Sequence, residues 1–281
     1  MPSIGYLGPR GTFSQEALEA NVGDEFESHV PCSTIPEVLF AVESGKVTNG
    51  IVPIENSIEG SVNVTLDTLA FETHLFIERE FVHPVRHRLA TRPRVWRNEI
   101  KTIVSHPHAT AQCRQFLARN FPKTPIVAAN STAEAALEVS RSEEPRAAVT
   151  TEIAARLYDL VVLERDIEDY ESNQTRFILV GKEQAPRTGA DKTSMACFIR
   201  ENRPGSLLEI LTEFASRGIN LTKIESRPTK KLLGEYYFFI DILGHVEDVH
   251  VRDALGSLMG KLREIKLLGS YAAASPPQEV E

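Results

Sequence analysis

The feature of this sequence that most restricts its fold is a pattern that recurs through the first 182 residues. A short apolar strand ends in a polar or glycine-containing loop, and a helical run follows it. Four such units are predicted, with strands at 3–7, 50–54, 101–104 and 147–149 and loops at 8–14, 55–61, 105–108 and 150–152. Apolar strands that alternate with helices are typical of an α/β domain with largely parallel sheets.

One extended stretch, 74–89, interrupts the alternation. Because the pattern then resumes, we expect two lobes: lobe one at about 1–76 and 174–182, and lobe two at about 77–173. A strand at 176–180 is expected to return to lobe one. The cleft between two such lobes is a usual place for a small ligand. Residues 183–192 contain Pro186 and Gly189 without periodicity and are predicted to be a linker.

A second, smaller domain is predicted over 193–271. Strands are expected at 194–200, 219–226, 235–243 and 265–271, and helices at 205–217 and 247–261. The first helix carries Leu207, Leu208, Leu211 and Phe214 on one face. The order βαββαβ is the ferredoxin-like arrangement. The tail 272–281 has almost no large apolar residue and is predicted to be disordered.

Charge and cysteine usage exclude several classes of protein. The formal net charge of -8 argues against nucleic acid or an anionic membrane as the main partner. The three cysteines are far apart and form no CxxC, so neither a disulfide framework nor a zinc site is expected. Without a signal peptide or an apolar run of about 20 residues, we expect a cytoplasmic protein.

Metal and cofactor motifs are also missing. Residues 8–12 match neither GxGxxG nor a P-loop. The pair His106 and His108 resembles two metal ligands, but no third ligand follows at helical spacing. The pair His83 and His87 is discounted too, since Pro84 argues against a helix that brings them together. No metal and no cofactor are therefore predicted.

The loops that begin the helices offer another kind of site. Helix N-termini leave backbone N–H groups unpaired and carry a partial positive charge, so each can bind a carboxylate or phosphate. Several such ends that converge on a cleft would suit a substrate with two carboxylates. Serine and threonine at these positions fit helix caps equally well, so this pattern alone does not decide between the two readings.

At six ordered motifs the sequence resembles prephenate dehydratase, from Ile4 to about Tyr271. Four motifs lie in the first domain: 8–14, 53–57, 105–107 with Gln112, and Thr175-Arg176-Phe177. Two others, 202–208 and 225–228, are similar to ACT-domain regulatory motifs. The resemblance implies a two-lobed, periplasmic-binding-protein-like catalytic domain followed by an ACT domain.

The resemblance also implies the reaction. Prephenate loses its ring carboxylate as CO2 and its ring hydroxyl as water, which gives phenylpyruvate for phenylalanine biosynthesis. A poor leaving group requires a proton or a strong hydrogen-bond donor at its oxygen, and the family's essential threonine is Thr175 here. Arg176 is expected to polarise Thr175 or to bind a carboxylate, and Glu55 to orient Asn56 or to relay a proton. Substrate contacts are expected from Asn56, Thr12, Ser14, Ser57, Ser105, Gln112 and Phe177.

For the ACT domain, the resemblance implies feedback inhibition by L-phenylalanine and self-association as a homodimer or homotetramer through the ACT and catalytic domains. The sequence has Gly205-Ser206-Leu207 where the family usually has Gly-Ala-Leu, and His108 replaces a frequent glutamine. The expected effector-binding residues are Asn202, Pro204, Gly205, Ser206, Leu207, Leu208, Asn220, Leu221, Glu225 and Ser226.

Three rival functions remain at this point. Arogenate dehydratase catalyses the same reaction on the aminated substrate, and the sequence does not distinguish the two. A non-catalytic ligand-binding protein would share a two-lobed cleft. A ligand-responsive DNA regulator is disfavoured because no helix-turn-helix segment or basic face is present.

Overall fold

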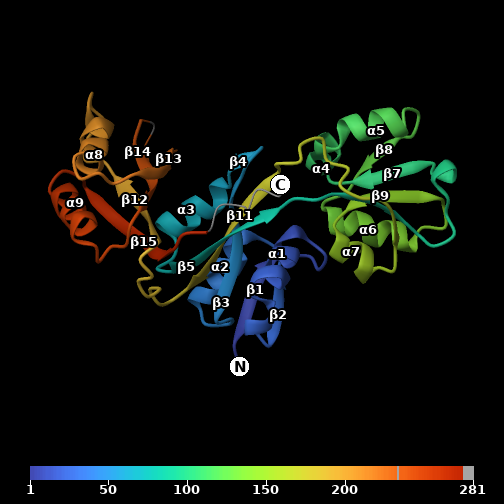
Figure 1. Ribbon diagram of the computed structural model, residues 1–281, viewed down its shortest axis with the longest axis horizontal. Helices are drawn as coiled ribbons and strands as arrows, with labels where there is room; N and C mark the ends of the chain where they lie inside the picture. The colour runs from blue at the N-terminus through green and yellow to red at the C-terminus, as the bar shows by residue number, and fades with distance from the viewer. Residues whose placement is uncertain (233, 275–281) are drawn as a thin grey trace. The chain divides into compact units, whose positions relative to one another are not determined.

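The computed structural model describes residues 1–232 and 234–274, and its fold is mixed α/β (Figure 1). The chain forms two compact units. The first unit comprises Met1–Val38, Glu55–Gly60 and His83–Thr175, and the second comprises Leu39–Ile54, Ser61–Val82 and the chain from Arg176 onward. Five elements have residues in both units: α2 (Ile35–Glu43), β3 (Asn49–Asn56), β4 (Gly60–Ser61), β5 (Phe76–Pro84) and β11 (Gln174–Gly181).

The first unit begins with two parallel strands, β1 (Ser3–Leu7) and β2 (Ser28–Cys32). Helix α1 (Phe13–Asn21) and the 3-10 helix η1 (Gly23–Glu25) connect them. Helix α1 starts where Thr12, in extended conformation, accepts a hydrogen bond from the Gln15 backbone. Just before it, Gly11 has a φ of +91°, and a Cβ there would lie 2.9 Å from that of Ala154, so only glycine fits without strain.

A five-stranded sheet forms the rest of the first unit, in the order β10-β6-β9-β7-β8. Strand β7 is parallel to β8 and β9, whereas β6 is antiparallel to β9 and β10. The strands are β6 (Arg88–Thr91), β7 (Thr102–Ser105), β8 (Ile126–Ala128), β9 (Arg146–Thr150) and β10 (Val161–Glu164), with the 3-10 helix η2 (Arg97–Glu99) before β7.

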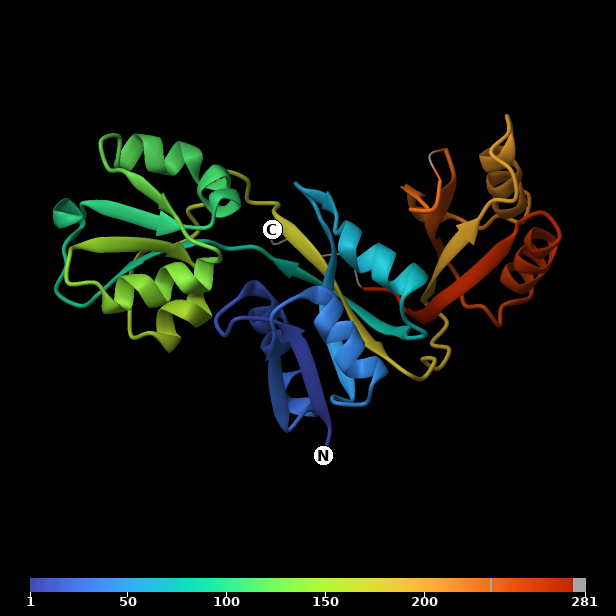
Figure 2. The same cartoon turned by 180° about the vertical axis from the view of Figure 1, so that it is seen from behind.

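Helices cover both faces of this sheet (Figures 1 and 2). Helices α4 (Pro107–Gln112) and α5 (Arg114–Asn120) pack their apolar residues on one face. Helices α6 (Thr132–Arg141) and α7 (Glu152–Leu157) cover the other, largely through alanines that allow close approach. The single helix predicted up to about residue 120 is thus two helices, interrupted at the fully buried Cys113.

The second unit contains β3, β11 and β5 side by side in that order. Helix α3 (Asn63–Phe71) follows β4 in the chain. A four-stranded antiparallel sheet in the order β13-β14-β12-β15 completes the unit. Its elements are β12 (Asp191–Phe198), α8 (Ser206–Ala215), β13 (Leu221–Pro228), β14 (Tyr236–Leu243), α9 (Val249–Met259) and β15 (Glu264–Ala272). The predicted βαββαβ order is confirmed.

The two faces of this sheet are both covered. Apolar residues of α8 and α9, among them Ile210 and Leu258, form one core with β12 and β14. On the other face, Tyr237 of β14 stacks edge to face on Phe71 of α3, with ring centroids 5.1 Å apart. Six consecutive residues of β14 are buried because both faces of the strand have partners.

Most of the predicted elements are present within one to four residues at each end. Elements that the sequence pattern did not single out are β2, β4, β8, β10, α2, α6 and the 3-10 helices η1 and η2. Strand β12 begins at Asp191, inside the stretch predicted as linker. Residues 275–281 of the predicted disordered tail lie outside the described residues, and the predicted lobe and linker boundaries stay predictions. In the described part of the chain, every helix is too short or too polar to span a membrane.

Candidate active site

A cavity of about 290 Å³ lies within the first unit. Its wall comes from the ends of β1 and β3, from the segments that follow β1, β3, β7 and β8, and from the segment between β5 and β6. Thr175, the second residue of β11, completes it. The lining residues are Leu7, Thr12, Phe13, Ser14, Asn56, Glu59, Val85, His87, His106, His108, Ala109, Gln112, Asn130, Ser131, Thr132 and Thr175.

Three helix N-termini contribute to this wall. Thr12 caps α1, His106 caps α4, and Ser131 caps α6 by accepting a hydrogen bond from the Glu134 backbone at 2.9 Å. Convergence of helix N-termini was one of two interpretations of the loops, and α6 was not among the expected helices. The sixteen lining residues include no lysine or arginine, so the helix ends supply the positive potential for an anionic ligand.

Asn56 is the best-anchored polar side chain in the cavity. Its carbonyl oxygen Oδ1 accepts hydrogen bonds from the backbone N–H groups of Ile58 (2.9 Å) and Glu59 (3.0 Å). The amide nitrogen Nδ2 therefore points the other way. It donates to Thr175 Oγ1 and to Asn173 Oδ1, each at 2.9 Å, and the Gln174 carbonyl oxygen lies slightly farther away at 3.1 Å. Since an amide nitrogen has no free lone pair, Thr175 accepts this bond and keeps its own proton for another acceptor.

The hydrogen bonds continue from Asn173 to Gln112. Asn173 is fully buried, and its Nδ2 donates to Gln112 Oε1 at 2.9 Å. The same oxygen lies 3.0 Å from the Nε2 atom of His87, whose ring stands edge to face against Phe13 at 5.3 Å. His87 is only 1% exposed, and burial lowers the pKa of its imidazole. The cavity is thus bordered by one continuous chain of hydrogen bonds that ends at Thr175.

Five of the ten residues predicted for catalysis or substrate binding line this cavity: Thr175, Asn56, Thr12, Ser14 and Gln112. Two others border it without lining it. Ser57 bridges strand segments, as its hydroxyl donates to Ser172 O and accepts from the Gln174 N–H. Ser105 is fully buried at the end of β7, where its hydroxyl donates to Val149 O at 2.6 Å.

The remaining three predicted residues lie elsewhere. Glu55 is half-buried in β3 and is not among the lining residues. Phe177 is buried in the second unit. Arg176 also belongs to the second unit, where its guanidinium donates to Glu80 and Asp241, each at 2.6 Å, and to the Tyr271 hydroxyl at 2.9 Å. Because successive side chains alternate along a strand, Arg176 points away from the face that presents Thr175.

The residues predicted to bind the effector cluster around the start of α8 and around β13. Gly205 has a φ of +93° at the N-cap of α8, and Leu208 is 65% exposed on that helix. Asn202 Nδ2 donates to Gly234 O at 2.9 Å. On β13, Glu225 accepts a hydrogen bond from Ser61 at 3.0 Å. Pro204, Asn220 and Ser226 are exposed, while Leu207 and Leu221 pack partly against the core.

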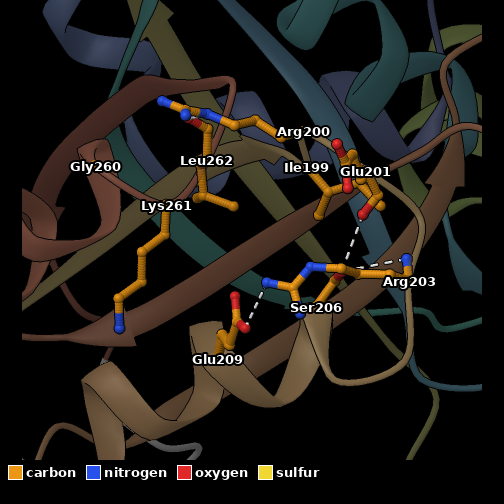
Figure 3. Close-up of a pocket in the computed structure, with 9 residues that line it drawn as sticks. All are labelled: Ile199, Arg200, Glu201, Arg203, Ser206, Glu209, Gly260, Lys261 and Leu262. Carbon is orange, nitrogen blue, oxygen red and sulfur yellow. Dashed lines mark hydrogen bonds and ion pairs between the residues drawn. The ribbon is translucent and has the colours of Figure 1, made fainter.

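A second cavity, of about 470 Å³, lies beside these residues (Figure 3). Ser206 belongs to both the predicted effector set and the cavity wall, and its hydroxyl donates to Glu201 O at 2.9 Å. Arg203 pairs with Glu209 at 2.7 Å across one side. The full lining consists of Ile199, Arg200, Glu201, Arg203, Ser206, Glu209, Gly260, Lys261 and Leu262.

His87, His106, His108, Glu59 and Asn173 were not predicted as site residues. His106 and His108 were noted as possible metal ligands, and His108 also as the replacement of a frequent glutamine. Within residues 1–232 and 234–274, no group of three His, Cys, Asp or Glu side chains is arranged to hold a metal ion. Little in the sequence indicates a role for His87, because the residues that contact a single histidine in an extended stretch cannot be deduced from the sequence. Asn173 lies two residues before the predicted Thr175, and this proximity in the sequence is the signal that could have found it.

Comparison with known proteins agrees with this geometry. The prephenate dehydratase family model matches residues 4–185, and the ACT domain model matches residues 198–258. A curated prephenate dehydratase from Amycolatopsis methanolica is 44% identical over 279 residues, which cover 98% of this chain and 90% of the relative.

Two solved structures resemble the whole chain. The crystal structure of prephenate dehydratase in complex with L-Phe from Arthrobacter aurescens is 41% identical, with a TM-score of 0.90, and the match covers 96% of this chain and 90% of that one. A protein described as GqqA, a novel type of quorum quenching acylase, is 28% identical with a TM-score of 0.86 over 98% of both chains. These two relatives share the fold but are described with different activities. The fold alone therefore does not assign a function, and any assignment must rest on the residues of the cavity. On the family model and the identity to the curated relative together, this chain belongs to the prephenate dehydratase family.

Proposed function

We propose that this chain is a carbon–oxygen lyase that converts prephenate to phenylpyruvate, water and CO2, with Thr175 at the reacting centre. The observation that carries the proposal is the 2.9 Å hydrogen bond from Asn56 Nδ2 to Thr175 Oγ1 inside the cavity. Asn56 is held by two backbone N–H groups, so the direction of this bond is fixed.

The chemistry requires little beyond positioning and one strong donor. Loss of CO2 and hydroxide makes the ring aromatic, which supplies the driving force. The hydroxyl is a poor leaving group, and a donor at its oxygen lowers the barrier. Thr175 accepts from Asn56 and directs its own O–H outward. The amide dipole of Asn56 also makes that O–H a better donor, because hydrogen bonds in a chain polarise one another.

Prephenate carries two carboxylates, and the helix N-termini provide the sites for them. Thr12 and Ser14 stand at the start of α1, and Ser131 and Thr132 at the start of α6. Helices of nine and ten residues present unpaired backbone N–H groups there. Such ends favour anions without a net positive charge on the protein, which explains how a chain of net charge -8 binds a dianion.

The Thr175→Val variant tests the proposal. Valine keeps the branched shape and removes the hydroxyl, so we expect kcat to fall at least 100-fold, about 2.7 kcal/mol of barrier, with a small change in KM. The assay follows phenylpyruvate formed from prephenate. Thr102→Val, on strand β7 outside the cavity, serves as the matched control. Near-normal turnover by Thr175→Val would remove this residue from the mechanism.

We further propose that the ACT domain binds L-phenylalanine and that two or four copies associate through it and the catalytic domain. The relative solved with L-Phe supports this effector. Strand β13 is at an edge of its sheet with Ile224 43% exposed, so it is available to a second copy. A side chain at Gly205 is strained at a φ of +93°. Gly205→Ala is therefore expected to keep basal turnover and to weaken phenylalanine inhibition.

Two further measurements test the substrate and the oligomeric state. The ratio of kcat/KM for prephenate and for arogenate decides between the keto and the amino substrate, and we expect prephenate to be preferred. Sedimentation analysis with and without phenylalanine reports the number of copies. Cys32, Cys113 and Cys197 are buried thiols, which fits our proposal of a cytoplasmic location.

A further inference from the structure

His87 is a buried histidine whose ring protonation can be deduced from its neighbours. The deduction starts at Asn56, because backbone N–H groups hold its Oδ1 and leave Nδ2 as the donor to Asn173 Oδ1. With its oxygen already used as an acceptor, Asn173 turns its Nδ2 towards Gln112 Oε1. A reversed Gln112 amide would place two N–H donors face to face, so Oε1 is fixed at this position.

The proton on His87 follows from this direction. A carbonyl oxygen only accepts, so the Nε2 atom 3.0 Å from Gln112 Oε1 carries a hydrogen. The other ring nitrogen, Nδ1, is buried and has no hydrogen-bond partner in the described part of the chain. A proton added to Nδ1 would therefore be buried without an acceptor, which costs free energy. Burial lowers the pKa of the ring accordingly, and His87 stays neutral with its proton on Nε2.

The ring itself is firmly placed. Phe13 packs edge to face on it with an interplanar angle of 89°, and the His87 backbone N–H donates to Glu168 Oε2 at 2.8 Å. His87 thus presents a rigid donor to one end of the chain of amides, and Thr175 lies at the other end. Each member fixes the orientation of the next.

We propose that His87 is a positioning residue of the dehydration: together with Asn173 Nδ2, its Nε2–H holds Gln112 Oε1, so that the Gln112 amide nitrogen stays turned towards Glu59 and the cavity. This proposal rests on the proposed dehydratase function. It assigns no contact between His87 and the reacting atoms, so His87 should act on turnover rather than on substrate affinity.

Kinetics of two substitutions test the role. His87→Phe keeps an aromatic ring against Phe13 and removes the donor, so kcat should fall about tenfold, which corresponds to 1.4 kcal/mol of barrier, while KM changes less than about twofold. His87→Gln places an N–H near the position of Nε2 and should restore kcat to within about threefold of the wild type. His83→Phe, on the same stretch but outside the cavity, is the matched control and should keep wild-type kcat.

A double-mutant cycle tests whether His87 acts through Gln112. In a Gln112→Leu background the orientation of residue 112 no longer depends on a donor, so adding His87→Phe should change kcat by less than about twofold. A tenfold effect that persists in this background would overturn the proposal. Unchanged kcat in His87→Phe, or no rescue by His87→Gln in a variant that melts at the wild-type temperature, would overturn it as well.

A spectroscopic measurement is independent of turnover. Nitrogen chemical shifts of 15N-histidine-labelled protein, assigned with the His87→Phe variant, should show Nε2 protonated and Nδ1 unprotonated at pH 7. The opposite tautomer or a charged ring would refute the proposal. A wild-type protein that shows this tautomer but does not turn over prephenate would instead refute the proposed function, and the two failures are thereby distinguished.

Discussion

The substitution Arg176→Met separates a structural from a catalytic role for the arginine that follows Thr175. Arg176 lies in the second unit with its side chain 11% exposed, and its two carboxylate partners, Glu80 and Asp241, are 1% and 0% exposed. Burial disfavours a charged guanidinium, but the nearby Tyr271, Asp241 and Glu80 outweigh it and raise the pKa of Arg176. Methionine retains much of the side-chain volume and removes the positive charge and all five donors.

The magnitude follows from what the substitution leaves behind. Glu80 still pairs with Lys192 at 2.6 Å. Among the described residues, Asp241 retains only the hydroxyl of Ser194, which donates to its other oxygen. A buried carboxylate that loses its partner costs about 3–5 kcal/mol. At roughly 2–4 °C per kcal/mol for a domain of this size, the melting temperature should fall by about 6–20 °C.

The assay is thermal and urea unfolding followed by circular dichroism, with kcat measured well below the transition. Arg165→Met, which removes an arginine that is 58% exposed in its pair with Glu152, is the matched control and should change stability by less than about 1 kcal/mol. In the double variant Arg176→Met/Asp241→Leu no orphan carboxylate remains, so most of the lost stability should return.

One result would refute this reasoning. If Arg176→Met melts like the wild type and yet loses turnover, then the guanidinium acts on the substrate and the ion pairs contribute little. We expect the reverse: reduced stability, with kcat of the folded fraction closer to that of the wild type than the kcat of Thr175→Val.

Two predictions concern the effect of acid. Burial lowers the pKa of His87 despite the nearby Glu168 and Glu16, so the folded state resists a proton that the unfolded chain binds below about pH 6.5. The contribution of neutral His87 to the free energy of unfolding is therefore complete above that pH and is lost as the pH falls. In His87→Phe, the urea midpoint should depend less on pH between about pH 7 and 5 than in the wild type. For Asp67, burial opposes ionisation, but hydrogen bonds from Arg227, Lys230 and Tyr237 prevail and lower its pKa. Asp67→Asn should lower the free energy of unfolding by about 1–3 kcal/mol at pH 7. The wild type should lose this stability only as the pH falls below about 4, and urea midpoints measured across this range would show the difference.

The strand pattern predicted much of the fold because apolar runs and caps are local signals. The strand at 3–7 and the βαββαβ order after 193 are examples. Helix α6 was not predicted because its buried face consists largely of alanines such as Ala135 and Ala136, whose small side chains give little apolar contrast. Strand β8 was not predicted because its three residues, Ile126 to Ala128, are all exposed and show no alternation of buried and exposed positions.

Only the site residues that belong to a recognisable sequence motif could be predicted. Thr175, Asn56 and Gln112 came from motif resemblance, and the structure places all three around one cavity. His87 could not be found in this way, since its role depends on a ring nitrogen 3.0 Å from a residue 25 positions along the chain. Arg176 shows the opposite case: its motif suggested the reaction, while burial beside Asp241 indicates a role in the second unit.

In the proposed mechanism, the direction of the hydrogen bonds, rather than their number, lets the uncharged hydroxyl of Thr175 act as a donor to the substrate. Backbone N–H groups at 58 and 59 can only donate, so Asn56 has a single orientation and Thr175 a single free proton. A substrate oxygen that accepts from Thr175 extends the chain of hydrogen bonds without reorienting any member, so the site is organised before the substrate arrives and little reorganisation is left for the moment of reaction.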